Sequence, residues 1–329
     1  MKDQIMQFNK FLKAAAFALL AGHMAAGMAN DNEWPTRAVK IVVPFSAGSA
    51  TDLITRQLAH NLGIKFKQPF IVENKPGGSA GIGSVAVARA PADGYTLLMT
   101  GPASMVTNKF TVKNLSYNPD KFEKVALVAY TPNVLLTNKD QPFKTLAEMI
   151  QYAKANPGKL TYASFGAGTT SHIAGEMLKQ MAGVDIVHVP YKGAGDAIPA
   201  LIAGHVSMYF DTIMTALPQV KSGRLISLGL STSKRSDMAK SIPTIAEQNY
   251  PAYDIAPWYG IAAPQGTPKH IVNQLNLAIN EALDTPDFKA KLQGTGAEAM
   301  GGSVQDFEQF IAREMPKTEA IIAAAGLKP

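Results

Sequence analysis

The sequence predicts an α/β protein of two lobes, each a mostly parallel sheet flanked by helices. Its 329 residues exceed the usual size of one hydrophobic core, although a single large barrel is the alternative that this length leaves open. Short apolar runs alternate with amphipathic stretches, and this alternation is typical of sheets covered by helices. An apolar content of 47% and a charged content of 17% suffice to bury such cores and exclude a chain that is disordered throughout.

The first 29 residues have the pattern of a secretory signal peptide. Three lysines within the first 13 residues precede a short apolar run at 14–21, and Gly27 and Ala29 supply the small residues of a cleavage site. The apolar run is well below the roughly 20 residues that a membrane-spanning helix needs. We therefore expect export and removal of residues 1–29. A stable uncleaved anchor is the alternative, since His23 interrupts the apolar segment.

Charge and cysteine content narrow the class of ligand and exclude several chemistries. Removal of residues 1–29 takes away three lysines and one aspartate, so the formal net charge falls from +6 to +4. Lysines and arginines are scattered without long runs, so we expect no nucleic-acid partner. A weak positive field suits a small anionic ligand. The absence of cysteine excludes disulfides, Cys-ligated zinc and thiol catalysis.

The first lobe is predicted to begin with a βαβαβ unit. The apolar run at 39–45 predicts a buried strand, and apolar residues at helical spacing predict a helix that starts at Leu53 and ends at Gly63. The remaining elements of the unit are a strand at 70–74, a helix at 82–90 and a strand at 95–100.

A second α/β lobe is predicted after residue 143. Its helices are expected at 145–155, 172–181 and 197–203, and its strands at 160–164, 186–189, 207–210 and 225–230. One more strand at 258–263 and two helices at 269–283 and 304–324 close the chain and are expected to pack back on the first lobe. We therefore assign residues 30–131 and 256–329 to domain 1 and residues 132–255 to domain 2, with hinge crossovers near residues 131 and 255.

Two loops that each follow a strand and open a helix are the strongest candidates for a binding site. Helix N-termini present unpaired backbone N–H groups and the positive end of the helix dipole, so residues 46–52 and 165–171 are candidate anion sites. Hydroxyls and glycines in both loops could donate to a ligand or let the backbone approach it. The alternative is that the two loops are only N-caps and tight turns and bind no ligand. One such loop in each lobe favours binding, because closure of a cleft would bring them face to face.

The motifs that could indicate an enzyme are weaker signals than the two candidate loops. Residues 77–81 fit the G-x-S-x-G elbow of serine hydrolases with Ser79 as nucleophile, but Lys75 and Pro76 separate that serine from the preceding strand and no histidine is placed as its base. Residues 81–86 and 166–168 echo dinucleotide-binding fingerprints, but the first follows a Gly-rich loop and the second lacks its third glycine. We predict no enzymatic activity and no cofactor.

The remaining polar candidates each have a structural and a functional interpretation. The six histidines are dispersed, so His172 and His188 are expected to form structural hydrogen bonds, and no metal site is predicted. Asp52 is most simply a capping residue, although it could orient the first loop. Asp211, near a strand end, could bind loop backbone or accept a hydrogen bond from the ligand. Four aromatic residues could line a pocket or belong to the core: Phe45, Phe165, Tyr191 and Tyr209.

The motifs, taken together, resemble the Bug family, the TctC-like periplasmic receptors of tripartite tricarboxylate transporters. The resemblance covers nearly the whole predicted mature chain in the family's order. It is carried by residues 43–52, 72–78, 93–98, 162–164, 166–172, 188–193, 210–211, 242–247, 258–260 and 263–268.

The resemblance implies a two-lobed periplasmic-binding-protein (Venus-flytrap) fold whose two loops grip a ligand carboxylate. It implies a periplasmic receptor that delivers a small mono- or dicarboxylate, aromatic acids included, to the membrane components of a transporter, and we expect a monomer. The alternatives are a non-transport sensor for a signalling partner and an exported serine hydrolase that uses Ser79. Family members often have a second glycine where this chain has Ser49. The implied first-lobe ligand residues are Phe45, Ser46, Ala47, Gly48, Ser49, Thr51 and Asp52. Those of the second lobe are Gly166, Ala167, Gly168, Thr169, Thr170, Ser171, His172, Tyr191, Lys192 and Asp211.

Overall fold

The computed structural model describes residues 34–191 and 193–328. The chain divides into a short N-terminal unit, Met1–Thr36, and a unit that spans Arg37–Pro329, to which all elements below belong. The predicted signal peptide lies outside the described residues. Within the described ranges, no helix combines the length and the apolar character needed to cross a bilayer.

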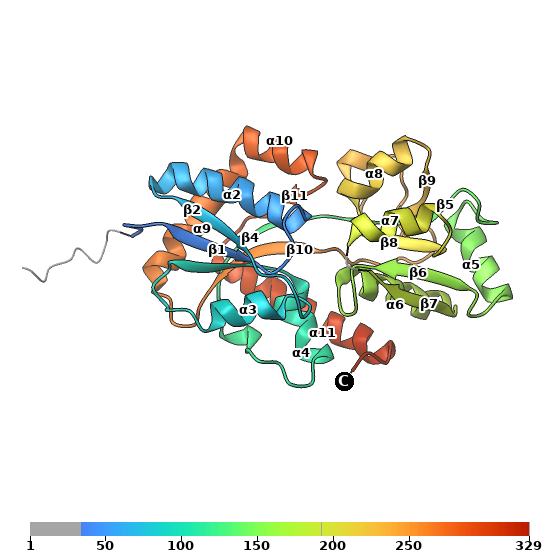
Figure 1. Cartoon of the computed structure of the whole chain (residues 1–329), viewed down its shortest axis with the longest axis horizontal. Helices are drawn as coiled ribbons and strands as arrows, with labels where there is room; N and C mark the ends of the chain where they lie inside the picture. The colour runs from blue at the N-terminus through green and yellow to red at the C-terminus, as the bar shows by residue number, and fades with distance from the viewer. Residues whose placement is uncertain (1–33, 192, 329) are drawn as a thin grey trace, which may run out of the picture. The chain divides into compact units, whose positions relative to one another are not determined.

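The first sheet has six strands in the order β11-β4-β10-β3-β1-β2 (Figure 1). Strand β1 pairs in parallel with β2 and β3, whereas β10 and β11 pair antiparallel with their neighbours. The sheet is therefore mixed, and only its β1–β3 half has the parallel pairing that we expected. The strands are β1 (Val39–Val43), β2 (Phe70–Asn74), β3 (Thr96–Thr100), β4 (Glu123–Tyr130), β10 (Trp258–Ala263) and β11 (Glu298–Ala299).

Helices cover both faces of this sheet (Figure 1). On one face lie α2 (Ala50–Phe66), α9 (Lys269–Asp284) and α10 (Pro286–Gly294); on the other lie α3 (Gly81–Ala88), α4 (Asn108–Thr111) and α11 (Val304–Ala324). Helix α2 buries Ile54, Leu58 and Leu62 at helical spacing. The prediction that Gly63 ends α2 is wrong. The helix continues to Phe66, whose ring packs 5.6 Å from that of Phe70, and Lys67 takes the left-handed cap.

The second sheet has the order β7-β6-β8-β5-β9 and is also mixed. Strand β6 pairs in parallel with β7 and β8, whereas β5 pairs antiparallel with β8 and β9. Apolar clusters fill both faces, with α5 and α6 on one and α7 and α8 on the other. The elements are β5 (Asn133–Asn138), α5 (Leu146–Ala155), β6 (Leu160–Ser164), α6 (Thr170–Ala182), β7 (Ile186–Pro190), α7 (Ala194–Ile202), β8 (Met208–Thr212), α8 (Ile213–Lys221) and β9 (Leu225–Leu230).

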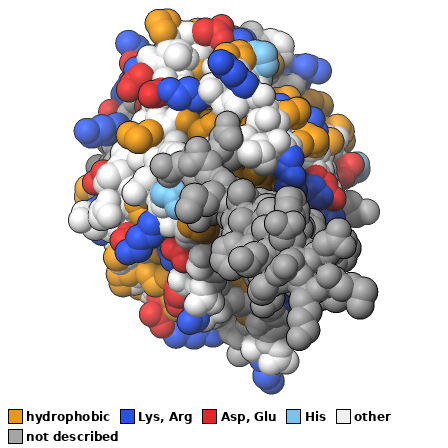
Figure 2. Space-filling view, turned by 90° about the vertical axis from the view of Figure 1, so that its left-hand side faces the viewer, with side chains coloured by type: hydrophobic (Ala, Val, Ile, Leu, Met, Phe, Trp, Pro, Cys, Tyr) orange, Lys and Arg blue, Asp and Glu red, His pale blue; other side chains and the backbone are white. Residues whose placement is uncertain are grey.

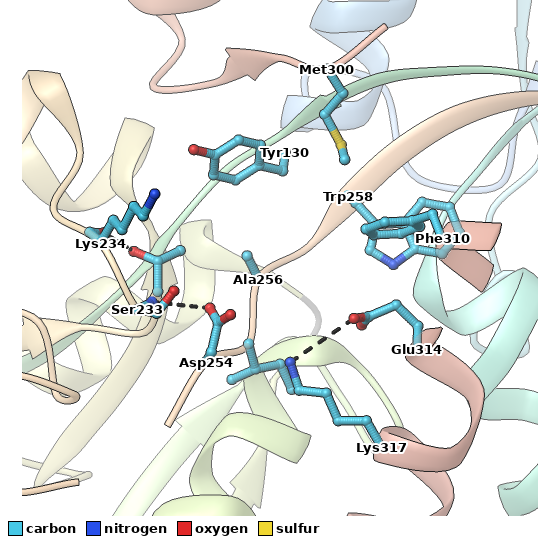
Figure 3. Close-up of a pocket in the computed structure, with 12 residues that line it drawn as sticks. Tyr130, Ser233, Lys234, Asp254, Ala256, Trp258, Met300, Phe310, Glu314 and Lys317 are labelled. Carbon is cyan, nitrogen blue, oxygen red and sulfur yellow. Dashed lines mark hydrogen bonds and ion pairs between the residues drawn. The ribbon is translucent and has the colours of Figure 1, made fainter. Parts of the chain in front are cut away.

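The chain passes between the two sheets at the β4–β5 and β9–β10 connections. A pocket of about 240 Å³ lies there, lined by Tyr130 at the end of β4 and by Asp254 of the β9–β10 connection (Figure 3). Trp258 also lines it, and the centroid of its ring lies edge-to-face 5.3 Å from that of Phe310. These connections lie close to the predicted hinge positions, and the hinge itself remains a prediction.

Helix α11 packs back on the first lobe, as expected, and also reaches the second. It contacts β4, but its last turn places Ile321 and Ile322 in the apolar cluster of the second lobe beside α6. The C-terminal helix therefore joins both lobes.

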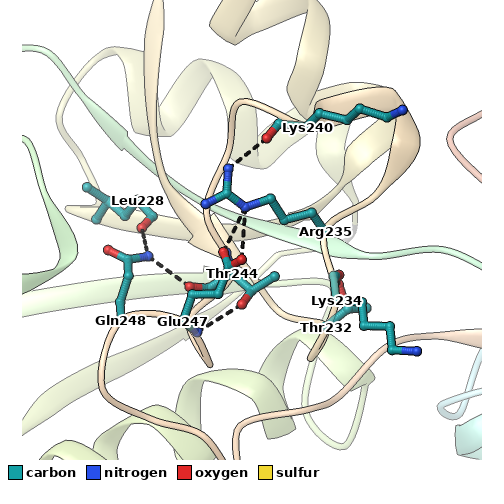
Figure 4. Close-up of polar contacts among 8 residues, drawn as sticks. All are labelled: Leu228, Thr232, Lys234, Arg235, Lys240, Thr244, Glu247 and Gln248. Carbon is teal, nitrogen blue, oxygen red and sulfur yellow. Dashed lines mark hydrogen bonds and ion pairs between the residues drawn. The ribbon is translucent and has the colours of Figure 1, made fainter.

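A polar cluster holds the segment after β9 against the edge of the second sheet (Figure 4). Arg235 donates from Nε to both carboxylate oxygens of Glu247 at 3.0 and 2.8 Å, and Glu247 also accepts from the backbone N–H of Thr244 at 2.8 Å. Gln248 donates to the carbonyl of Leu228 in β9 at 2.9 Å. These bonds cover an edge strand that would otherwise expose its backbone.

The described surface carries charges of both signs. Where described side chains are visible in Figure 2, lysines and arginines are interspersed with acidic residues. This face therefore shows no broad basic patch of the kind that binds nucleic acid.

Candidate ligand-binding site

The first candidate loop, residues 44–49, connects β1 to α2 and is held by a contact between its glycine and the helix. Gly48 has φ +79°, a conformation that favours glycine, and its N–H donates to Oδ2 of Asp52 at 2.9 Å. Ser49 is the N-cap and accepts from the backbone N–H of Asp52 at 3.3 Å. Ser49, which stands where family members often have glycine, therefore forms a regular N-cap of α2.

Asp52 orients this loop through hydrogen bonds to both of its carboxylate oxygens. Arg56 donates to its Oδ2 at 3.0 Å, and the Asn74 amide donates to its Oδ1 at 2.9 Å and to the carbonyl of Phe45 at 3.1 Å. Burial acts to raise the pKa of Asp52, but the hydrogen bonds from Arg56, Gly48 and Asn74 outweigh it and lower that pKa. Because both carboxylate oxygens are occupied, a positioning role fits better than ligand contact.

The second candidate loop, residues 165–169, connects β6 to α6 and is built in the same way. Gly168 has φ +75°, and its N–H donates to Nδ1 of His172 at 3.0 Å. The Thr169 hydroxyl donates to the carbonyl of Gly166 at 2.7 Å, and the backbone N–H of Phe165 donates to Oγ of Ser171 at 2.9 Å. The hydroxyls of Thr169 and Ser171 are therefore used to shape the loop.

Both loops share one device, a contact from a left-handed glycine to the side chain four residues later. In both, the first helical N–H groups have no intrahelical acceptor because no carbonyl precedes them in helical register. These are the N–H groups of Ala50 and Thr51 in α2 and of Thr170 and Ser171 in α6. Among the loop hydroxyls, no hydrogen bond within the described residues engages those of Ser46 and Thr170. Each lobe thus has, at the start of its helix, two backbone donors and one hydroxyl of the kind that anions accept hydrogen bonds from.

The second loop contacts the first lobe directly. The Ser79 hydroxyl donates to the carbonyl of Ala167 at 3.1 Å, and a Cβ on Gly168 would lie 3.5 Å from Oγ1 of Thr111. Ser79 has φ +49°, an uncommon conformation for a residue other than glycine. The Ser79 hydroxyl thus forms a hydrogen bond from the first lobe to the second loop, and it contacts no histidine among the described residues.

Two stacked histidines lie behind the second loop. The rings of His172 and His188 are 3.9 Å apart, and Nε2 of His188 lies 2.6 Å from Oγ of Ser164. Ser164 in turn accepts from the N–H of Gly166 at 3.0 Å. Burial lowers the pKa of both histidines, that of His188 to about 4. His172 is 4% exposed, and its contact through Nδ1 is with the backbone of the loop itself.

The distal candidates fall into different environments. Asp211 is fully buried, and burial raises its pKa to about 7. Its Oδ1 accepts from the backbone N–H of Thr212 at 2.8 Å, while Oδ2 has no partner among the described residues. Tyr209 is fully buried and packs 5.6 Å from Phe165, so Tyr209 belongs to the core. Tyr191 and Phe45 are half-buried, and Lys192 lies outside the described residues.

The glycine motif at residues 81–86 serves packing. A Cβ on Gly83 would lie 2.8 Å from Cβ of Pro44, so this glycine allows α3 to approach the first loop closely. The described residues contain no group of three or more His, Cys, Asp or Glu side chains that could hold a metal ion.

The sequence interpretation missed several residues that shape the site. Asn74 ends β2 beside the end of β1, and the parallel pairing of Val43 with Asn74 brings it to the first loop. A strand-end asparagine next to a candidate loop is a signal that could have identified it. Ser164 was also missed: it lies on β6 and contacts His188 of the adjacent β7, whose structural hydrogen bond was predicted. A contact between strands of this kind leaves no local pattern in the sequence.

A scan against protein-family models matches residues 54–327 to the Tripartite tricarboxylate transporter family receptor (TctC). This match confirms the family that the sequence motifs predict. It is a family of receptors, so it also confirms the prediction of a binding protein without enzymatic activity.

Solved structures of similar fold agree with this family assignment. The structure of R. palustris Rpa4515 with adipate has a TM-score of 0.85 and 36% identity, over 90% of this chain and 99% of that one. The periplasmic binding protein BugD has a TM-score of 0.80 and 31% identity, over 90% and 99%. MatC (Rpa3494) from Rhodopseudomonas palustris with bound malate has a TM-score of 0.80 and 31% identity, over 88% and 100%. The predicted periplasmic-binding-protein fold is confirmed.

Proposed function

We propose, because this chain belongs to the tripartite tricarboxylate transporter receptor family, that it captures a small carboxylate between its two lobes and delivers it to the membrane components of such a transporter. The family is one of periplasmic solute-binding receptors. The identity of the ligand as a carboxylate, the two-loop grip and the delivery step are the proposal.

The pairing of the two loops is the observation that carries this proposal. Each lobe offers two helix N-terminal N–H groups and a hydroxyl, all located where a strand ends and a helix begins. A carboxylate has two oxygens that can accept several charge-assisted hydrogen bonds. One carboxylate reaching both loops would bridge the lobes and thereby favour the closed arrangement.

Relatives narrow the ligand class. The related structures hold adipate in Rpa4515 and malate in MatC, both of them dicarboxylates. In this chain the second end of such a ligand would lie toward the half-buried Tyr191, because Asp211 is fully buried. We therefore place small mono- and dicarboxylates first among ligands, and aromatic acids next because Phe45 and Tyr191 are half-buried and near the loops in sequence.

The predicted signal peptide would carry the receptor to the periplasm, where it would act as a monomer. Closure around the ligand would create the surface that a membrane partner recognises. This step follows from family membership and from the two-lobed fold.

Isothermal titration calorimetry of residues 30–329 tests the proposal. Ligand-free protein is titrated with adipate, malate, succinate, benzoate, citrate and an uncharged amide of adipate. We expect at least one carboxylate to bind and the amide to fail. Ser46→Ala and Thr170→Ala should each raise Kd about ten-fold or more, because a hydrogen bond to a charged group contributes about 1.5–3 kcal/mol.

Thr145→Ala is the matched control, since Thr145 caps α5 outside both loops through a capping box with Glu148. It should lower stability without changing Kd. Absence of binding by every carboxylate would contradict the ligand class. Binding that Ser46→Ala and Thr170→Ala leave unchanged would contradict the two-loop grip.

A further inference from the structure

The second loop depends on a hydrogen bond that only an uncharged imidazole can accept. The N–H of Gly168 points at Nδ1 of His172 with a separation of 3.0 Å. A backbone N–H is always a donor, so Nδ1 must carry a lone pair and the ring proton must sit on Nε2. Protonation of Nδ1 would set two donors against each other at this distance.

In the first loop the corresponding glycine N–H donates to a carboxylate instead of an imidazole. Gly48 donates to a carboxylate oxygen of Asp52, and Arg56 and Asn74 keep that carboxylate ionised. An ionised carboxylate accepts hydrogen bonds across the whole neutral and mildly acidic range. The two loops are therefore alike at neutral pH and differ below it, because the imidazole of His172 titrates and Asp52 stays charged.

The surroundings of His172 oppose its protonation without preventing it. Burial is the largest influence and lowers its pKa, and Lys179 acts in the same direction, while Glu176 opposes them. Glu176 accepts from the Tyr162 hydroxyl at 2.7 Å and pairs with Lys179 at 2.9 Å. The titratable and charged groups around the ring are His188 from β7, Tyr162 from β6, Glu176 and Lys179 from α6, and Tyr253, whose hydroxyl donates to the carbonyl of Ala174.

We propose that His172 is the positioning residue of the second loop and that this loop binds the ligand carboxylate only while His172 is uncharged. The inference rests on the two-loop function proposed above. The 4% exposure of His172 supports it, because a buried imidazolium whose Nδ1–H faces the N–H of Gly168 would be an unpaired buried charge, so the ring takes up a proton only when this loop contact breaks. The first loop keeps its shape in acid, so the receptor loses one of its two grips and releases ligand.

The test measures Kd by calorimetry from pH 7.5 to pH 4.5 for the wild type, His172→Asn and His172→Leu, with the best ligand from the panel. The wild-type Kd should rise as pH falls and approach ten-fold per pH unit below the pKa of His172, as one proton is linked to one ligand. His172→Asn offers a side-chain oxygen in place of Nδ1 and cannot titrate. It should bind more tightly than His172→Leu at every pH and show no such rise beyond the ligand's own titration.

His205→Asn is the control, because His205 is an exposed histidine of the same lobe. It should follow the wild-type curve. The amide signal of Gly168, followed by NMR without ligand, should move with the His172 titration, which makes the test independent of any variant that folds poorly.

The outcomes separate the two proposals. If no carboxylate binds the wild type, the proposed function fails. If carboxylates bind but the wild-type and His172→Asn curves have the same slope, or binding tightens in acid, the positioning role of His172 is overturned. A Gly168 amide signal that does not respond to the His172 titration would overturn it as well.

Discussion

At the scale of single residues, the same backbone task is done by different side chains in the two lobes. The side chains of Asp52 and His172 each accept a hydrogen bond from the backbone N–H of the glycine four residues earlier, and both side chains are buried. Asp211 is a third buried ionisable residue, but its Oδ2 has no partner among the described residues. Its carboxyl group therefore favours the neutral form, whereas that of Asp52 favours the ionised one.

Asp211→Asn should change how stability depends on pH. The pKa of Asp211 is raised from 3.8 to about 7, so the folded state holds a proton that the unfolded state has lost between these values. Stability from this group is present below pH 3.8 and is lost as pH rises through about 7. The shift of roughly three pKa units corresponds to at most about 4 kcal/mol.

Urea unfolding of the wild type and Asp211→Asn at pH 4.5 and pH 8 measures this effect. The variant should gain stability relative to the wild type between the two pH values. A difference between the two proteins that is the same at both pH values would contradict the buried, proton-holding Asp211.

At the scale of elements, the candidate site is two copies of a strand–loop–helix unit whose loops are fixed from behind. The first is fixed by Asn74 of a neighbouring strand and the second by Ser164 and His188. The glycine and hydroxyl spacing of both loops could be predicted from sequence, because these residue types have local conformational preferences. The particular hydrogen bonds by which Asn74, Ser164 and His188 fix the loops could not be predicted, because they depend on strand register.

Other elements escaped prediction for a related reason. Strand β5 is buried along its whole length and β4 along most of it, so they lack the alternation that marks a half-buried strand. The antiparallel pairing of β10 also had no sequence signal, which is why a mostly parallel sheet was expected. Helix α8 begins directly after β8 with Pro218 in its interior, and a proline argues against a helix from sequence alone.

Asn74→Ala should loosen the first loop. It removes the bonds from Asn74 to Phe45 and Asp52 and leaves Asp52 with one buried oxygen unpaired. We expect a stability loss of about 1–3 kcal/mol and weaker carboxylate binding. Asn61→Ala is the control, because Asn61 makes a single bond to the carbonyl of Gln57 within α2. Equal Kd values for the two variants would contradict the role of Asn74.

At the scale of the whole molecule, three features of the described chain connect the lobes. The chain crosses at two connections beside the pocket of Figure 3, helix α11 enters the core of the second lobe, and Ser79 donates to Ala167. Two of these bring the second loop or its helix to the first lobe. A ligand held by both loops would therefore add to contacts that already exist between the lobes.

The central claim is that one carboxylate is held by both loops at once. Backbone amide NMR of residues 30–329 during titration with the bound dicarboxylate tests it most directly, with the N–H signals of Ala50 and Thr51 reporting on one loop and those of Thr170 and Ser171 on the other. We predict that all four signals shift and saturate at the same ligand concentration. Shifts confined to one loop, or centred on Tyr130 and Trp258 in the pocket between the connections, would contradict it.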